Sequence, residues 1–543
     1  TGTNGVKSLT GVNVKRLFRY IDGLGRPLQD ISVAQSPNSK DIIDFFEFDV
    51  QGREIKRYLP YAHASQSNGN FIGSPSTEQA TFHNSFLPGD GTYAYSEYEF
   101  DNSPLNRVLK ERPPGSSFRN HPKEIIYGTN TNPAEVRNFI TGGYYAINSL
   151  YKTTHKDENS NSVITYVDKI GRKIMVNNAG ARTYYIYNDF GNIIAVITPE
   201  GSKLGHSNST LLFTHSSIIP KRFSYGYDSK QRMTTKTIPG ANAYTYVYDR
   251  IDRLVLTIDA NGFKEYTKYD ILNRPILTGR YTGSSNTPGS STPLYENKTA
   301  TGHFYTTNLT FPTSNTQIYT VTYYDDYYFN SNYTDNVSYT VPPPVASSHY
   351  DASAYNFVRS KITGTKVGVL KQDGTAPTQF LSTYIFYDKW GREIQTKADN
   401  HLGGQDLTWS QYNFQNWLLR TRRQHAATVQ GSPKSYTINQ TFLYDHAGRS
   451  TFVYHQVGDA TWAEKLIALQ AYNEKNELRQ KYIGGLGLTF LQTVDYKYNI
   501  RGWLTDINDF NSPADLFALK LSYGTGDTAL DAGFTGGAGA NWD

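Results

Sequence analysis

The sequence contains no cysteine among its 543 residues. It can therefore form neither a disulfide nor a thiolate metal site, and a chain this long can bury enough apolar surface to fold without them. The absence weighs against an animal extracellular protein, in which disulfides are usual. No run of residues approaches the apolar length of a membrane-spanning helix, so we expect no membrane insertion.

Excess charge of one sign is also missing, because 53 basic residues face 48 acidic ones and the net charge is only +5. A nucleic-acid-binding protein is expected to concentrate a basic face. The densest basic cluster, Arg420, Arg422 and Arg423, is isolated, and we interpret it as a solvated strand end. We therefore expect no nucleic acid partner.

Methionine is rare, with 2 residues, whereas aromatic residues are abundant, with 44 Tyr, 27 Phe and 6 Trp. Aromatic and β-branched side chains suit the pleated, half-buried surface of a sheet, so this composition indicates a β protein. The chain opens on Thr1-Gly2-Thr3-Asn4, without an initiator Met or a signal peptide. We interpret it as an internal segment of a longer protein, whose localisation cannot be inferred from this end.

Signatures of catalysis are scarce. The 12 His residues show no metal-binding spacing, and no Gly-x-Ser-x-Gly nucleophile motif occurs. The adjacent acids Asp325 and Asp326 could bind calcium, although a solvated turn is the simpler interpretation. A carboxylate pair for glycoside hydrolysis would meet only in space, and no sequence feature indicates one. We expect a protein that is not an enzyme, with no catalytic residue, no cofactor and no metal.

One short phrase recurs along the chain: an aromatic residue, Asp or Asn, two variable residues, then Gly and often Arg. Clear instances begin at Phe48, Tyr187, Tyr387, Tyr444 and Tyr498. The spacing is 21 residues from Tyr166 to Tyr187, and again between Tyr227, Tyr248 and Tyr269. A fixed period of this size is typical of a repeat architecture.

Each phrase predicts a tight turn between two strands. The Asp or Asn side chain can bond nearby backbone N–H groups, and Gly accepts the positive φ that the turn requires. The aromatic residue would stack along the sheet, and the Arg could pair with an acid of the neighbouring repeat. The predicted structural turn residues are Asp49, Gly52, Asp168, Gly171, Asn188, Gly191, Asp388, Gly391, Asp445, Gly448, Asn499 and Gly502.

An isolated hairpin is marginal in water, so the repeats are expected to join. We predict an all-β fold with few or no helices, in which one spiralling sheet forms part of a hollow shell. Residues 463–480 test this prediction, because they consist largely of strong helix formers. Tyr472-Asn473 and Asn476 nevertheless occupy the phrase positions, which favours strand, turn and strand over the alternative of a helix.

The chain divides into five stretches. They are an irregular N-terminal β region at 1–150, regular repeats at 151–280, a Tyr-, Ser- and Thr-rich irregular insertion at 281–380, repeats with wider spacing at 381–510, and a Gly-rich tail at 511–543.

The repeated phrases resemble the YD repeats of Rhs proteins, and more closely those of Rhs-type proteins from Bacteroidota. The segments at 20–29 and 58–61 resemble the uncharacterised domain that precedes the repeats in those proteins. Further matches are Ser103 to Arg107, Asp399 to His401 with Gly403-Gly404, and Tyr498 to Leu504, so that the resemblance runs from about residue 17 to residue 507.

The resemblance implies a hollow β-shell that encloses a C-terminal cargo, often a toxin of the polymorphic kind. Cargo release in relatives uses an Asp-Pro cleavage site, and this chain contains no Asp-Pro dipeptide. The expected function is a non-catalytic shell segment of a large exported protein, at the surface of or outside a Gram-negative bacterium, with type IX secretion as a hypothetical route. The alternatives are an adhesin that binds glycans through Trp409 and Trp417, and an enzyme.

Overall fold

A computed structural model describes residues 15–116, 119–290, 292–300, 302–327, 338–342, 350–429, 431–458, 464–486, 489–509 and 512–523. Within these residues the fold is almost entirely β, with 32 strands in a single sheet. The expected fold class is therefore confirmed.

The strands of the N-terminal third are β1 (Leu17–Ile21), β2 (Pro27–Ser32), β3 (Ile42–Phe48), β4 (Glu54–Tyr58), β5 (Tyr61–Ala62), β6 (Tyr95–Phe100), β7 (Val108–Arg112), β8 (Lys123–Thr129), β9 (Tyr151–Lys156), β10 (Ser162–Val167) and β11 (Lys173–Asn178). The middle strands are β12 (Ala181–Tyr187), β13 (Ile193–Ile197), β14 (Arg222–Tyr227), β15 (Met233–Thr237), β16 (Ala243–Tyr248), β17 (Leu254–Ile258), β18 (Lys264–Tyr269), β19 (Pro275–Tyr281), β20 (Thr316–Asp325) and β21 (Val358–Gly368). The last are β22 (Phe380–Tyr387), β23 (Glu393–Asp399), β24 (Gln405–Tyr412), β25 (Leu418–Val429), β26 (Ser432–Tyr444), β27 (Ser450–Val457), β28 (Lys465–Tyr472), β29 (Leu478–Leu486), β30 (Thr489–Tyr498), β31 (Leu504–Ile507) and β32 (Leu519–Lys520).

These strands form a meander in which each strand pairs antiparallel with its successor. One departure occurs near the start, where β4 pairs with β6 and the short β5 pairs with β3. Because the phrase turns follow alternate strands, they all lie on the same side of the sheet, where one set of strand ends meets. We call this side the turn edge. The connections between β2 and β3, β7 and β8, and β9 and β10 lie at the other edge, which we call the opposite edge.

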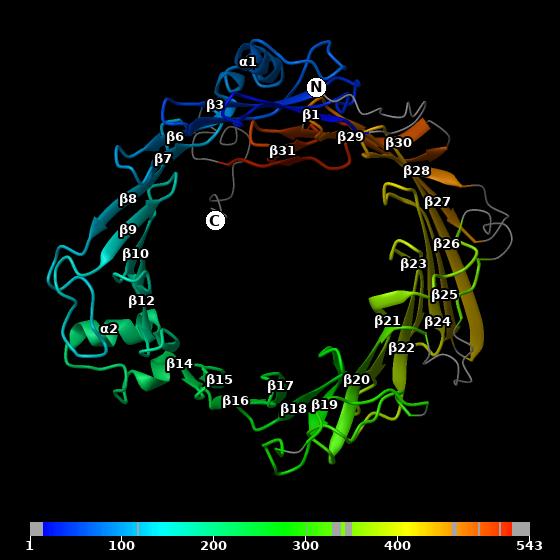
Figure 1. Ribbon diagram of the computed structural model, residues 1–543. Helices are drawn as coiled ribbons and strands as arrows, with labels where there is room; N and C mark the ends of the chain where they lie inside the picture. The colour runs from blue at the N-terminus through cyan, green and yellow to red at the C-terminus, as the bar shows by residue number, and fades with distance from the viewer. Residues whose placement is uncertain are drawn as a thin grey trace.

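The meander bends round into a ring, so that β30 and β31 reach the place where β1 begins (Figure 1). Two α-helices occur in the described part, α1 (Pro75–Phe86) and α2 (Pro199–Ser207), and both lie on the outer side of the ring (Figure 1). The 61.2 kDa chain exposes 31339 Å², whereas a compact globular protein of this mass exposes about 20,000 Å². The extra exposed area is what a sheet with two accessible faces produces.

The apolar core is divided into clusters along the wall. The largest joins Tyr184 and Ile197 of the sheet to Phe139 and Leu204, which come from the segment before β9 and from α2. Buried Arg137 ties these covering segments together, because its Nε donates to the carbonyl oxygen of Gly205 at 2.9 Å. This stretch of wall is thus held by a layer of covering chain.

Segment 463–480 forms strands where it is described, as β28 and the start of β29, and the prediction of strand, turn and strand is confirmed. The two helices were not predicted. Helix α2 starts at Pro199, and the Thr198 hydroxyl caps it by accepting from the N–H of Gly201 at 3.4 Å.

The described helices include none with the length and hydropathy needed to cross a bilayer. The insertion at 281–380 contributes β20 and β21, and the Gly-rich run 533–540 of the tail lies outside the described residues.

The interpretation of Arg422 as a solvated residue is wrong. Its side chain is buried in β25 and its Nη1 donates to Asn439 Oδ1 at 3.2 Å, because β25 is a paired interior strand.

Candidate functional site: the linked repeat turns

The repeat turn is built around one carboxylate. Asp388 Oδ1 accepts from the N–H groups of Trp390 at 2.8 Å and Arg392 at 3.0 Å, and its Oδ2 accepts from Arg392 Nε at 2.5 Å. Two backbone bonds close the loop, from Asp388 N to Arg392 O and from Gly391 N to Asp388 O, each 3.0 Å. One side chain therefore satisfies three donors that the tight turn would otherwise leave without partners.

The same pattern recurs along the turn edge. The residues whose carboxylates accept two backbone N–H groups and an Arg Nε are Asp22, Asp49, Asp101, Asp168, Asp228, Asp249, Asp270, Asp388 and Asp445. The phrases without this Arg use an amide oxygen for the two backbone bonds, as at Asn188 and Asn499.

The fourth position of the regular turns has a positive φ. In most of them it is Gly, as at Gly52, Gly171, Gly191, Gly391, Gly448 and Gly502, with φ between 75° at Gly391 and 87° at Gly448. In the turns after β14, β16 and β18 it is Gln231, Asp252 and Asn273, with φ 63°, 70° and 63°. Asn476, which the sequence placed at a glycine position, has φ 66°. Left-handed backbone is where Gly, and next to it Asn, is tolerated at least cost.

The phrase Arg pairs mainly with the acid of its own turn, and not with a neighbouring acid as the sequence suggested. The cause is geometric, because residues i and i+4 face each other across the turn. The same guanidinium then reaches forward to the next repeat: Arg392 Nη1 donates to the carbonyl of Asn413 at 2.5 Å, and its charge lies 5.1 Å from the ring centre of Tyr412. Some arginines bind a second acid as well, as Arg274 does with Asp325.

The phrase Tyr reaches backward, which the sequence did not reveal. Tyr444, Tyr472 and Tyr498 donate their hydroxyls to main-chain carbonyls of the preceding repeat, at Leu418 (2.8 Å), Ser450 (3.0 Å) and Leu478 (2.9 Å). A phrase that has both residues, such as the one from Tyr444 to Arg449, is thereby bonded to the repeat before it by Tyr and to the repeat after it by Arg.

Charge and burial at these turns shift several pKa values. The hydrogen bond from Arg107, with further bonds from Ser103 and the backbone, lowers the pKa of Asp101 to about 2. At Asp49 the backbone N–H of Arg53 is the largest of the groups that hold the pKa of the carboxyl below its ordinary value. Burial raises the pKa of Tyr387 to about 12. These acids are ionised and these phenols neutral at pH 7, as a structural role requires.

The acidic pair that could have bound calcium is occupied by cations of the chain itself. Asp325 accepts from Arg274 through both carboxylate oxygens, at 2.7 and 2.5 Å, and Asp326 accepts from Lys298 Nζ at 2.6 Å. Tyr328, at the end of that sequence stretch, lies outside the described residues. No group of three or more metal-ligating side chains occurs within the part of the chain that the structure describes.

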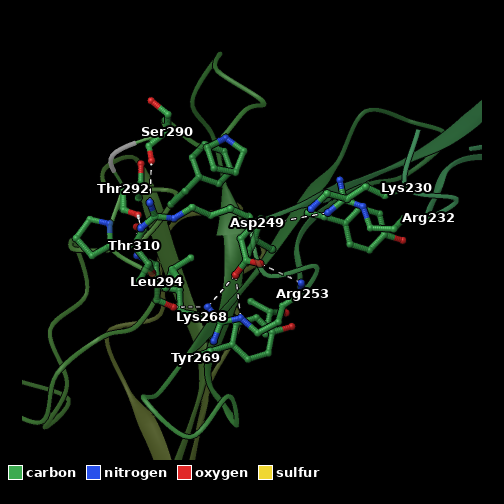
Figure 2. Close-up of a pocket in the computed structure, with 18 residues that line it drawn as sticks. Lys230, Arg232, Asp249, Arg253, Lys268, Tyr269, Ser290, Thr292, Leu294 and Thr310 are labelled. Atoms are coloured by element: carbon green, nitrogen blue, oxygen red, sulfur yellow. Dashed lines mark hydrogen bonds and ion pairs between the residues drawn. The ribbon is translucent and has the colours of Figure 1, made fainter. Parts of the chain in front are cut away.

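A pocket of about 310 Å³ lies between the turns after β14 and β16 and the connection from β19 to β20 (Figure 2). Five cationic side chains line it, Lys230, Arg232, Arg250, Arg253 and Lys268. Four of them are neutralised by nearby acids, and Arg250 donates to the carbonyls of Ser290 and Thr292. The pocket therefore has little net charge to attract an anionic ligand.

A fully buried ion pair anchors the wall beside this pocket. Lys268 Nζ donates to Glu296 Oε1 at 2.9 Å and to the carbonyls of Thr307, Thr310 and Pro312. Burial opposes the charge of Glu296, but Lys268 and the hydrogen bonds from Thr306 and Thr310 hold the pKa of Glu296 below its ordinary value. Sequence reasoning missed this pair, since Glu296 belongs to an irregular segment with no periodic signal.

Of the two tryptophans proposed for glycan binding, Trp409 is buried and Trp417 is partly exposed. Trp409 is only 2% exposed, and its Nε1 donates to the carbonyl of Thr340 at 2.7 Å. Trp417 packs against Tyr444, with ring centres 5.3 Å apart. Trp409 therefore offers no face to a sugar.

Comparison with protein families matches residues 1–131 to the model described as Domain of unknown function (DUF6443). No curated protein matches the chain. Among solved structures it is similar to the crystal structures of TcdB2-TccC3-Cdc42 (11% identity, TM-score 0.43) and TcdB2-TccC3 (12%, 0.42), and to a Photorhabdus luminescens Tc holotoxin pore with a mutated TccC3 (12%, 0.41). In each case 91% of this chain is covered, but only 23%, 24% and 25% of the other, so the chain spans about a quarter of their length.

Proposed function

We propose that this chain is a non-catalytic wall segment of a hollow shell, within a large exported protein of the Rhs type that encloses or displays a C-terminal cargo such as a toxin. The observation that carries the proposal is the bending of one continuous meander into a ring with two accessible faces (Figure 1). A compact enzyme or binding domain would instead fill its centre with one core.

The linked turns support this function, because they stiffen the wall. The phrases that contain Asp and Arg neutralise their own acid and bond forward through Arg, and the phrase Tyr bonds backward. Such a chain of bonds transmits load between repeats, and each group in it is already engaged with a protein partner. Side chains used in this way are poor candidates for catalysis.

The surroundings of the protein belong to the same proposal. We place it outside or at the surface of a Gram-negative bacterium, with its own cargo domain as the main partner and type IX secretion as the route. These assignments follow from the resemblance of the repeats to Rhs-type proteins of Bacteroidota.

A protection experiment tests the shell function. One protein would carry an epitope with a protease site after Asp543, and a second would carry the same element before Thr1. The last described strand, β32, pairs with β31, which lies on the inner side of the ring, so the C-terminal element should be cut several-fold more slowly (Figure 1). Equal cleavage rates at the two ends would argue against enclosure.

The glycan-binding alternative is the weaker one, because Trp409 is buried. Glycan-array binding that is lost on Trp417→Ala but kept on Trp390→Ala would revive it, since Trp390 is an exposed corner residue of the same edge.

A further inference from the structure

The two ends of the meander overlap without pairing as strands. Three consecutive phrase turns near the C-terminus contact N-terminal segments: His446 Nε2 lies 3.0 Å from the carbonyl oxygen of Ser36, Arg449 Nη1 donates to that of Gln35 at 3.4 Å, and Glu474 accepts from the N–H of Asn38 at 3.2 Å. No strand pairing joins β1 to the last strands within the described residues. The ring is therefore closed by these side-chain contacts.

The third of these turns reaches further along the N-terminal part. Arg501 Nε donates to the carbonyl of Pro114 at 3.4 Å, and its Nη1 lies 3.8 Å from Glu158 Oε1. The contacted segments are the connections from β2 to β3, from β7 to β8 and from β9 to β10, all at the opposite edge. The ring is consequently one turn of a spiral. The turn edge of its last repeats is stacked on the opposite edge of its first strands. We call this contact the lap joint.

Burial of the turn corners marks the extent of the lap joint. In the phrase Asp270-Ile271 the residue directly after the acid is 67% exposed, and Val50, at the same position after Asp49, is 97% exposed. In Asn499-Ile500 the same corner position is only 4% exposed. Since the turns share one geometry, the difference comes from what covers them.

The lap joint is polar and incompletely satisfied. Arg449 Nη2 and Glu474 Oε2 are buried there without a hydrogen-bond partner among the described residues. A buried polar group left in this state is destabilising. The other junctions around the ring are ladders of backbone hydrogen bonds, whereas the described lap joint has side-chain contacts and no strand pairing, so we infer that it is the weakest connection around the ring.

We propose that the described part of the N-terminal region that matches the domain of unknown function, residues 15–116 and 119–131, is the clasp that receives the last three phrase turns and closes the ring. Four of the contacted residues, Gln35, Ser36, Asn38 and Pro114, lie in that region. The lap joint is also where the ring opens. This inference concerns closure alone and holds whether or not the shell carries a cargo.

Distance measurements between spin labels test the proposal directly, and the chain's lack of cysteine makes site-specific labelling clean. One label pair spans the lap joint, at the exposed positions Thr81 of α1 and Arg479 of β29. A second pair spans the strand ladder, at His155 of β9 and Lys173 of β11. Both pairs are measured in the unmodified chain, in Ile500→Asp and in the matched control Ile271→Asp.

We expect a narrow distance distribution for both pairs in the unmodified chain. Ile500→Asp should lengthen and broaden the distance across the lap joint alone, whereas Ile271→Asp should change neither distance. A broad distribution across the lap joint in the unmodified chain, or an unchanged one in Ile500→Asp, would overturn the proposal.

If Ile500→Asp also changes the distance across the strand ladder, a second pair of variants tests the proposal. Arg449 and Arg392 each bind their own Asp and the next turn, but only Arg449 reaches the N-terminal region. Arg449→Ala should lengthen the distance across the lap joint and Arg392→Ala should not. Equal effects of the two would refute the clasp. The protease protection test above has a different readout, so failure of either proposal can be told from failure of the other.

Discussion

At the scale of the residue, each position of the repeated phrase has its own structural role. Asp or Asn satisfies the turn, Gly supplies the backbone conformation, Arg neutralises the acid and reaches forward, and Tyr bonds backward. The first two roles could be argued from the sequence, because turn chemistry is local. The last two could not, since they depend on which carbonyl or ring the neighbouring repeat presents.

A comparison of two neighbouring substitutions measures these roles. From turn chemistry alone, Gly391→Val should destabilise far more than Arg392→Ala. The structure reduces the expected difference in destabilisation between the two variants. Val at φ 75° costs about 1–3 kcal/mol. Arg392→Ala leaves Asp388, which is 4% exposed, without its cation, and this costs about as much or more. Urea unfolding midpoints of both variants check this, and an Arg392→Ala midpoint equal to that of the unmodified chain would contradict it.

The acids of the turns predict how stability depends on pH. The pKa of Asp101 is lowered from 3.8 to about 2, so the folded state favours the carboxylate. Its contribution is complete above about pH 4 and is lost as the pH falls towards 2. We expect the thermal midpoint of Asp101→Asn to lie below that of the unmodified chain at pH 7 and the difference to shrink below pH 4. The same substitution at the exposed corner residue Asp189 should show no such convergence.

At the scale of the element, the repeat outweighs local propensity. Residues 465–472 are good helix formers, yet they form β28 because strands on both sides supply hydrogen-bond partners. The two helices escaped prediction for the converse reason. Helix α1 lies in a polar stretch without a clear apolar period, and α2 begins at a Thr-Pro-Glu-Gly sequence that resembles a turn until the Thr198 cap is seen.

The buried pair Lys268–Glu296 holds the connection from β19 to β20 against the sheet. Removing one partner leaves an unpaired charge in the interior. Lys268→Met and Glu296→Leu should therefore each destabilise the fold by about 3–5 kcal/mol. The double variant should recover only the part of this loss that comes from the unpaired charge, because the carbonyls of Thr307, Thr310 and Pro312 still lose their donor. A double-mutant cycle of unfolding free energies measures the coupling.

Limited proteolysis provides the local readout for that cycle. Each single variant should expose the chain near Ser290 and Leu294 to cleavage, since this segment loses its anchor while the strands remain paired. Additive effects in the cycle, or cleavage no faster than in the unmodified chain, would mean that the segment is held by its other contacts. Those include the bond from Arg253 to the carbonyl of Leu294.

At the scale of the whole molecule, the order of strands was predictable and the closure was not. A periodic phrase indicates a meander, because each repeat needs a neighbour to bury its face. The lap joint brings together residues more than 400 positions apart, such as Ser36 and His446. No sequence pattern in either segment predicts its contact with the other. Curvature that accumulates over many strands decides where the ends meet, and no local pattern encodes it.

Solution scattering tests the shape that follows from this curvature. A compact chain of 543 residues would have a radius of gyration of about 24 Å. A wall bent round an open centre places its mass far from the middle, so the measured radius should be clearly larger. Ile500→Asp should increase it further by opening the lap joint, while the matched Ile271→Asp should not. A radius near 24 Å would mean that the sheet collapses on itself in solution, and the shell would then have no interior in which to hold a cargo.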